Sequence, residues 1–427
     1  MKVDTMRALD YWLGVPLCFV ASLLLAPFQR RPGKTPRNVL FIELSEMGSA
    51  ILVDPAMRKL RDESRCSLFF AIFAQNKPSL DLLGTVPDGN IYTIRDDTLL
   101  HLLIDALRFP FWARRNGIDT VIDLELFSRF TALMCGFAGA SNRVGFHSYH
   151  NEGLYRGSMM SHRVLYNPHR HIAKNFIALV NAVLSDRSEL PYSKTVVPDS
   201  EIRLAKAVPD PGQLSEFLSL VGDLVGQPIE PERHKIVLVN ANASELLIQR
   251  RWMPENYASL IRTIIAEHHD ALVLLTGSPG EFDEMERLRQ QVDQSRCWNT
   301  AGRFAFHELP LLYSISQLMV TNDSGPAHFA AVTELRVFVL FGPETPELYG
   351  SLGNSVPIYR NLACSPCVSA FNHRKTPCRD NVCLQLIKPH EVYETIKPDL
   401  QADPVLPSRL AASGALNAGT GSSGAQT

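Results

Sequence analysis

Short apolar runs alternate with helix-forming segments twice along this chain, and this alternation most strongly limits how it can fold. The first series comprises 39–42, 68–73, 121–124 and 143–146; the second comprises 236–239, 272–275, 318–320 and 337–341. Turn residues bound the runs, as is typical of parallel strands buried on both faces. The pattern predicts an α/β protein with two Rossmann-like, doubly wound halves that face a central cleft.

The length of 427 residues favours two domains. A Pro-rich and acidic stretch separates the two series and is typical of a crossover between domains. The predicted parts are an apolar anchor with a basic linker over 1–37, an N-terminal domain over 38–185, a crossover over 186–232, a C-terminal domain over 233–400 and a disordered tail over 401–427.

The N-terminal segment Trp12–Phe28 contains no charged residue. Four basic residues follow it: Arg30, Arg31, Lys34 and Arg37. The positive-inside tendency then keeps the rest of the chain in the cytoplasm. A cleaved signal peptide is the alternative, but acidic residues precede the apolar run. We expect an uncleaved anchor or interfacial hairpin that contributes to neither core, so that deleting residues 1–30 releases a folded protein.

The overall charge is nearly balanced, with a formal net charge of -2. Hydrophobic residues make up 45% and charged residues 20% of the chain, which is ordinary for a globular protein. A chain of this composition has no global basic field to hold nucleic acid, so we expect no nucleic-acid partner.

Three polar loops follow strands of the second series, where a doubly wound sheet binds its ligands. In the loop Asn322–His328, Gly325 permits close backbone approach, and backbone amides at the following helix start can hold a phosphate. Asp323 is suited to orienting the loop or accepting from a sugar hydroxyl. The alternative is a simple helix cap with a packed histidine.

Several segments, taken in order, resemble glycosyltransferase family 9, the heptosyltransferases of lipopolysaccharide synthesis. The segments are Leu40–Ser49, Arg250–Glu255, Gly277 with Glu281, Asn322–His328 and Phe341–Pro343. The resemblance covers most of 38–396. It implies the GT-B architecture, inverting transfer with no required metal, a nucleotide-sugar donor such as ADP-heptose, and an anionic glycolipid acceptor.

The resemblance also implies roles for single residues. Asp323 and His328 match the donor-site loop and are the predicted catalytic residues of the second half. Arg250 matches a basic residue near the donor phosphates, with Arg251 as its local competitor. The remaining predicted donor-binding residues are Asn242, Ser244, Glu281, Ser324 and Gly325.

The first half departs from the family at one position. Family members usually carry Asp directly after the glycine of the first loop, where it can deprotonate the acceptor hydroxyl, but this chain has Ser49. A serine hydroxyl is a poor base near neutral pH. We therefore predict Glu46 as the catalytic base, with Glu125 as the next candidate. The alternative is that Glu46 is a solvated loop acid.

Basic and histidine residues gather between 143 and 171. An anionic acceptor would be bound there by Arg143, Arg156 and His147, unless the stretch is an ordinary solvated loop. The cysteines Cys364, Cys367, Cys378 and Cys383 could hold a structural zinc, remain reduced, or form disulfides.

The leading hypothesis is a glycosyltransferase that acts on a lipid-linked envelope glycan at the cytoplasmic face of the inner membrane. A GT-B nucleotide-sugar epimerase is the alternative enzyme. A degenerate transferase that serves as a scaffold is the alternative without enzyme activity, and Ser49 keeps it open.

Overall fold

The chain forms two units in the computed structural model, which describes residues 3–28, 33, 35–149, 154–186, 189–243 and 245–409. Unit 1 comprises Met1–Arg203 together with Ala370–His373, and unit 2 comprises Leu204–Ser369 and Arg374–Thr427. In unit 1 the ring of Phe371 packs against those of Phe127 and Tyr166, which ties the short second segment to this unit.

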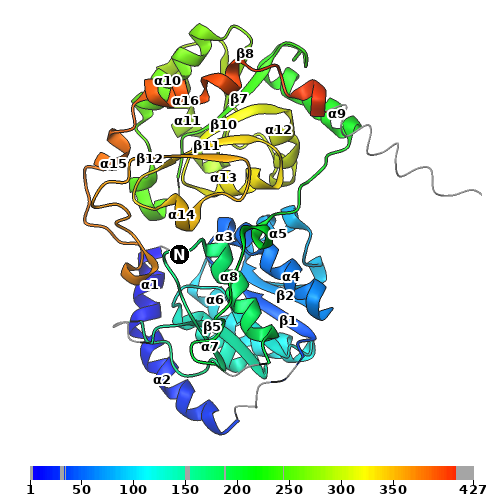
Figure 1. The fold of residues 1–427 in the computed structure, drawn as a ribbon, viewed down its shortest axis with the longest axis vertical. Coiled ribbons are helices and arrows are strands. Elements are labelled where there is room, and N and C mark those ends of the chain that lie inside the picture. The colour runs from blue at the N-terminus through cyan, green and yellow to red at the C-terminus, as the bar shows by residue number, and fades with distance from the viewer. Residues whose placement is uncertain are drawn as a thin grey trace, which may run out of the picture. The chain divides into compact units, whose positions relative to one another are not determined.

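Unit 1 contains a six-stranded parallel sheet in the order β3-β2-β1-β4-β5-β6. This is the doubly wound order, in which the direction of winding reverses between the first and fourth strands. Its strands are β1 (Asn38–Ile42), β2 (Ser67–Phe73), β3 (Ile91–Ile94), β4 (Thr120–Asp123), β5 (Asn142–His147) and β6 (His162–Leu165). Figure 1 labels β1, β2 and β5 of this sheet.

Unit 2 repeats this topology with the order β12-β11-β10-β7-β8-β9, again entirely parallel. The reversal lies between β7 and β10. Its strands are β7 (Lys235–Asn240), β8 (Ala271–Leu275), β9 (Cys297–Asn299), β10 (Ser316–Asn322), β11 (Arg336–Phe341) and β12 (Ser355–Tyr359). The predicted α/β class with two doubly wound sheets is confirmed.

Helices cover both faces of the unit 1 sheet. One face carries α1, α2, α6 and α7, whose apolar residues form a single core with β1, β2 and β4. The helix α4 packs on α8 and contacts β2, and α8 also contacts β5 and β6. The helices are α1 (Val3–Trp12), α2 (Gly14–Leu25), α3 (Met47–Leu52), α4 (Asp54–Ser64), α5 (Pro78–Leu83), α6 (Leu99–Arg115), α7 (Arg129–Phe137) and α8 (Ile172–Leu184).

In unit 2 one core joins the sheet to α10, α11 and α16, and α12 packs on α9. The bounds of α9 follow from its caps: Asp210 accepts from the amides of Gly212 and Gln213, and Gly226 ends the helix with a positive φ of 72°. The helices are α9 (Pro211–Val225), α10 (Pro254–Glu267), α11 (Phe282–Val292), α12 (Leu309–Ile315), α13 (Gly325–Phe329), α14 (Pro346–Tyr349), α15 (Val382–Gln385) and α16 (Pro389–Gln401).

The N-terminal helices are part of unit 1, which corrects the expectation that the apolar segment contributes to neither core. Cys18 and Ala21 of α2 are buried in the same core as the sheet. A Cβ on Gly14 would lie 2.7 Å from the Cβ of Arg129 on α7, so glycine is required for this close approach. Residues Thr5–Leu25 also form one helical stretch that is long and apolar enough to cross a membrane.

The beginning of the predicted tail is ordered against unit 2. Leu406 is buried, and the guanidinium of Arg409 donates to the carbonyl oxygens of Tyr313, Ser314 and Ser316. Ordered structure therefore extends beyond residue 401, where we expected the tail to begin. Residues 410–427 lie outside the described part of the chain.

Candidate functional site

Loops from three neighbouring strands of unit 2 bring charged side chains together at the carboxyl edge of the sheet. Arg250 follows β7, Asp323 follows β10, and Glu344 follows β11. The strands β7 and β10 flank the reversal point, where doubly wound sheets open a crevice for ligands. The amide of Asp323 donates to the carbonyl oxygen of Leu340 at 3.0 Å, which fixes its loop beside that of Glu344.

Arg250 is paired with both acids. Its Nη2 donates to Oε1 of Glu344 at 3.0 Å, and its Nε lies 3.4 Å from Oδ2 of Asp323. Arg374 adds a second cation, with Nε 3.8 Å from the same Glu344 oxygen and Nη2 donating to the hydroxyl of Tyr349 at 2.9 Å. Two arginines and two carboxyl groups therefore form one charge cluster.

Burial sets the protonation of this cluster. Desolvation raises the pKa of Glu344 to about 8, although Arg250 opposes the shift. Desolvation also raises the pKa of Asp323, again against Arg250. Burial alone would lower the pKa of Arg250, but its two acidic neighbours outweigh that effect and raise it. At neutral pH the cluster consequently carries a net positive charge, which suits an anionic ligand.

Several buried polar atoms in this region have no hydrogen-bond partner among the described residues. They include both amide atoms of Asn242, Oδ2 of Asp323 and Oε2 of Glu344. Buried polar groups are nearly always hydrogen-bonded in folded proteins. These atoms are therefore candidates to bond with a ligand at the reversal point.

The loop after β10 is held from both sides. Asn322 is fully buried; its amide nitrogen donates to the carbonyl oxygens of Ala241 and Asn242, and its oxygen accepts from the amide of Trp252. Ser324 precedes α13, which begins at Gly325. His328 lies buried in α13.

The side chains of Glu281 and Arg251 both form hydrogen bonds with backbone atoms of nearby loops. The Glu281 carboxylate accepts from the amide of Ser278 at 2.6 Å, beyond the end of β8. Arg251 donates twice to the carbonyl oxygen of Ala243 and pairs with Glu284. Of the two competing arginines, Arg250 is the one beside Asp323. Ser244, the remaining predicted donor-site residue, lies outside the described residues.

The predicted base lies in the loop after β1 of unit 1. Glu46 is half-buried directly before α3, and its Oε2 accepts from the hydroxyl of Ser49 at 3.2 Å. Ser49, which stands where family members usually carry Asp, is therefore hydrogen-bonded to Glu46, the residue predicted to replace that Asp as the base. Glu125 accepts at one oxygen from both amides and the hydroxyl of the Leu44–Ser45 segment, and burial raises its pKa.

Comparison with known proteins decides the family. The sequence profile of glycosyltransferase family 9 (heptosyltransferase) matches residues 113–376, more than half of the chain. The chain belongs to this family.

Characterised relatives of this family 9 chain are similar to it over only part of their length. Lipooligosaccharide heptosyltransferase 2 of Campylobacter jejuni is 26% identical over 167 residues, which are 38% of this chain and 50% of that protein. Lipopolysaccharide heptosyltransferase 2 of Salmonella typhimurium is 29% identical over 114 residues, 26% of this chain and 32% of that protein. The chain thus matches about half the length, or less, of these relatives.

Solved structures extend the likeness to nearly the whole fold. ADP-heptose lps heptosyltransferase II of E. coli superposes with a TM-score of 0.63 at 19% identity, covering 85% of this chain and 98% of that one. A family 9 glycosyl transferase from Veillonella parvula gives the same score at 16% identity, covering 86% and 98%. This family 9 protein therefore shares its fold with these two solved structures over most of its length.

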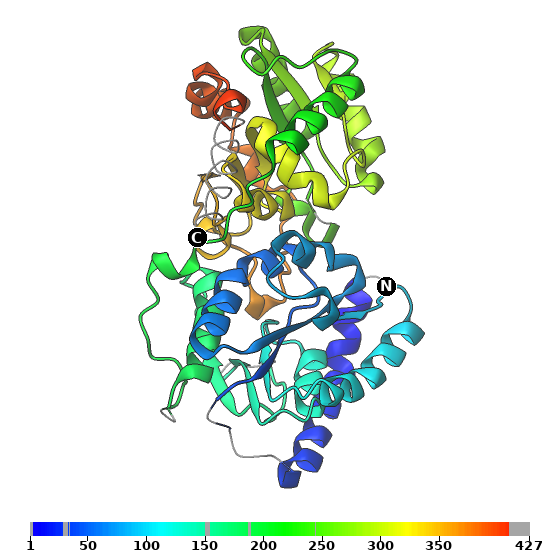
Figure 2. The same ribbon diagram turned by 90° about the vertical axis from the view of Figure 1, so that its right-hand side faces the viewer.

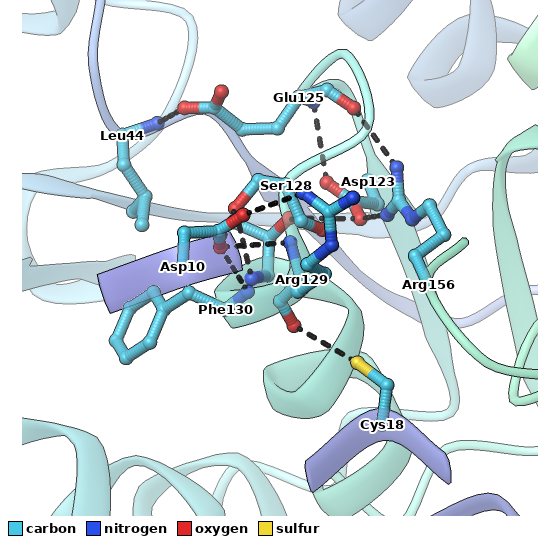
Figure 3. A network of polar contacts seen from close by, with 10 residues as sticks. Asp10, Cys18, Leu44, Asp123, Glu125, Ser128, Arg129, Phe130 and Arg156 are labelled. Atoms are coloured by element: carbon cyan, nitrogen blue, oxygen red, sulfur yellow. Dashed lines mark hydrogen bonds and ion pairs between the residues drawn. The ribbon is translucent and has the colours of Figure 1, made fainter. Parts of the chain in front are cut away.

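Two of the three predicted acceptor-binding residues are buried inside unit 1. Arg143 donates to the carbonyl oxygens of Met159, Ala140 and Ser141. Arg156 forms an ion pair with Asp123 and donates to the carbonyl oxygen of Glu125, as Figure 3 shows. Burial lowers the pKa of Arg156 to about 10.

Through these contacts Arg143 and Arg156 stabilise the interior of unit 1. His147 is partly exposed, and its ring lies edge-on to that of Tyr149. Burial, together with Arg163, lowers the pKa of His147. Contact of these residues with an acceptor stays a prediction.

The cysteine cluster gives no support to a zinc site. Over the described ranges, no three His, Cys, Asp or Glu side chains are grouped to hold a metal ion. All four thiols are free, with Cys364 exposed and Cys383 buried.

Sequence reasoning missed Glu344 and Arg374. Glu344 follows directly after Phe341–Pro343, a segment that carried the family resemblance, so the end of β11 could have pointed to it. Arg374 lies in an irregular segment with no periodic pattern, where the backbone takes a positive φ of 54°. No sequence signal links it to Glu344.

Proposed function

We propose that this family 9 chain transfers a heptose-like sugar from an ADP-activated donor to an anionic, lipopolysaccharide-type acceptor. Membership of the family supports the reaction class. The names of the relatives, lipooligosaccharide and lipopolysaccharide heptosyltransferase 2, support the sugar and the acceptor class.

The observation that carries the proposal is the pairing of Arg250 with Asp323 and Glu344 at the reversal point of unit 2. A metal-free transferase must stabilise a departing nucleoside diphosphate with cationic side chains and backbone amides. Arg250 and Arg374 would supply the charge. Asn242 and Glu281 would bond to other parts of the donor, and Asp323 would hold Arg250 and the loop in position.

Unit 1 would supply the base. In an inverting displacement the acceptor oxygen attacks the anomeric carbon, the bond to the diphosphate breaks, and a base takes the acceptor proton. The bond between Ser49 and Glu46 supports Glu46 in that role, because it holds the carboxylate at the loop where the family carries its acid. We propose that the reaction inverts the anomeric centre and needs no metal.

The cytoplasmic face of the inner membrane is the proposed location. An apolar helical stretch over Thr5–Leu25 and the basic residues that follow it support this location. A lipid-linked acceptor would be presented there.

Mass spectrometry of products from a panel of nucleotide sugars tests the proposal. The purified full chain is incubated with ADP-heptose, or with UDP- and GDP-linked hexoses, and with a heptose-deficient lipopolysaccharide core. A glycolipid heavier by one heptose, formed only from the ADP-linked donor, is the expected product. A change in the donor sugar without acceptor would indicate an epimerase, and no product from any donor would indicate a scaffold.

A further inference from the structure

The helix α2 is apolar around nearly its whole circumference, yet only one stripe of it is covered. The stripe of Gly14, Cys18, Ala21 and Ser22 is buried. The exposed large apolar residues of the segment are Leu13, Leu17, Phe19, Val20, Leu23 and Leu24. A helix that is apolar all round normally lies inside a protein core or in lipid.

Polar contacts hold the N-terminal helices on unit 1. The Asp10 carboxylate accepts from the amides of Arg129 and Phe130, both at 2.9 Å, and pairs with the Arg129 guanidinium at 3.2 Å (Figure 3). It therefore caps the N-terminus of α7, where a negative charge is stabilising. The hydroxyl of Ser22 accepts from the amide of Ser158 at 2.9 Å.

These contacts determine how α2 can meet a membrane. A helix that crosses the bilayer needs about 20 residues in its hydrocarbon core, which is roughly 30 Å thick. For α2 to cross, it would have to leave α7, break the hydrogen bonds of Asp10 and Ser22, and expose the part of the unit 1 core that Cys18 and Ala21 cover. While it stays packed on α7, α2 can only lie along a membrane surface.

A second apolar face lies on α6, in the same helix layer. Leu100, Leu103, Leu107 and Phe111 follow helical spacing on the side opposite the buried Asp105, Phe109 and Ala113. Leu107 is 72% and Phe111 75% exposed. Both α6 and α2 pack on α7, and Figure 2 shows the dark blue N-terminal helices and the cyan α6 on the same side of unit 1.

Basic residues lie on α6 and occur in the sequence that follows α2. Arg108, Arg114 and Arg115 are exposed on α6, and Arg37 is exposed just before β1. The sequence between α2 and β1 also contains Arg30, Arg31 and Lys34. Apolar side chains rimmed by arginines match an anionic lipid surface, where acyl chains cover the former and phosphate groups attract the latter.

We propose that unit 1 binds an anionic lipid surface through the outer faces of α2 and α6 together, with α2 lying in the plane of the membrane rather than crossing it. The proposal rests on the membrane location proposed above but not on sugar transfer. It adds α6, whose sequence is interrupted by charged residues, and it places the N-terminus on the same side of the membrane as both units.

Binding of the full chain to vesicles tests the role of α6. Vesicles of phosphatidylethanolamine with phosphatidylglycerol are compared with vesicles of phosphatidylcholine alone. A variant with Leu103→Glu, Leu107→Glu and Phe111→Glu should bind the anionic vesicles at least ~10-fold more weakly, because these exposed side chains would enter the acyl region. A matched triple variant that adds three glutamates at exposed positions of unit 2, Gln213→Glu, Gln291→Glu and Gln294→Glu, should bind as the wild type does.

The side of the membrane occupied by the N-terminus tests the in-plane orientation. An N-terminal epitope tag should resist protease in spheroplasts and be cleaved in inverted vesicles, as the units themselves are.

Unchanged thermal melting of the α6 variant shows that it folds. A tag on the outer side, or full binding by the α6 variant, would overturn the proposal. So would a dimer in light scattering that the α6 substitutions dissociate, which would identify a second copy as the occupant. Binding that persists without sugar transfer speaks against the proposed function alone.

Discussion

The guanidinium of Arg250 lies between the carboxyl groups of Asp323 and Glu344, 3.4 Å from the first and 3.0 Å from the second. Arg250 is thus the shared ion-pair partner of two acids, and both acids are almost completely buried. Two ionised carboxylates would cancel the charge needed to attract a diphosphate. Burial resolves this conflict by favouring the neutral form of Glu344, whose pKa is raised to about 8.

Removal of Arg250 should damage both binding and stability. Arg250→Ala leaves two buried acids without their cation, so we expect donor affinity to fall at least ~10-fold and unfolding free energy to fall by about 3–5 kcal/mol. Calorimetric titration with ADP and chemical denaturation measure the two effects. Arg289→Ala, which breaks a partly exposed pair with Glu286 on α11, is the control and should change neither.

The neutral form of Glu344 predicts a pH-dependent stability. Its carboxyl group has an ordinary pKa of 4.5 when unfolded and about 8 when folded. The folded chain therefore binds the extra proton, and this contribution is complete below pH 4.5 and is lost as pH rises to about 8. The glutamine of Glu344→Gln is uncharged at every pH. The unfolding free energy of this variant relative to wild type should therefore rise between pH 5 and 9.

Denaturation across this pH range provides the measurement. A relative gain on the order of 4 kcal/mol is expected for Glu344→Gln. The exposed Glu394→Gln should run parallel to wild type at every pH. Parallel curves for Glu344→Gln as well would mean that Glu344 is ionised in the folded chain.

The strands that sequence reasoning found share one physical property. All eight inner strands were predicted, since each is buried and contains a short apolar run, interrupted only by Asp123 in β4 and by Arg143 and Gly145 in β5. The four edge strands were missed. In β12, for example, no residue is fully buried and Pro357 interrupts the run, and β9 has only three residues. An edge strand has a neighbouring strand on one side only and tolerates proline, so its sequence carries a weaker apolar pattern.

The structure brings predicted site residues together where each follows a recognisable strand, and their role in donor binding stays a prediction. Arg250 and Asp323 could be found because the loops after β7 and β10 meet at the reversal point. Arg143 and Arg156 were expected on a basic surface, but charge alone does not distinguish a solvated arginine from one that donates to buried carbonyl groups. That distinction depends on tertiary packing.

The role of Glu46 can be tested by replacement and restoration. Glu46→Gln should lower the transfer rate at least ~100-fold with little change in donor affinity, because loss of a general base typically costs 10²–10⁴. Adding Ser49→Asp should restore much of the rate. Steady-state kinetics with the lipid acceptor measure both variants. Full activity of Glu46→Gln would place the base elsewhere, with Glu125 the next candidate.

The packing of α2 on α7 predicts that a single methyl group will destabilise unit 1. Gly14→Ala places a Cβ 2.7 Å from the Cβ of Arg129, so we expect a loss of about 1–3 kcal/mol. Gly89→Ala is a matched control, because no atom lies within 4 Å of its added Cβ. Differential scanning calorimetry compares the two. Equal melting temperatures would show that the N-terminal helices are not held on unit 1.

Acceptor-dependent release of ADP from ADP-heptose tests the proposed transfer most directly. The wild-type chain should release ADP only when a heptose-deficient lipopolysaccharide core is present. Asp323→Asn should lower that rate at least ~100-fold while the chain stays folded, because Asp323 would no longer hold Arg250 toward the departing diphosphate. Equal rates for Asp323→Asn and wild type, or no acceptor-dependent release by the wild type, would contradict sugar transfer at this site.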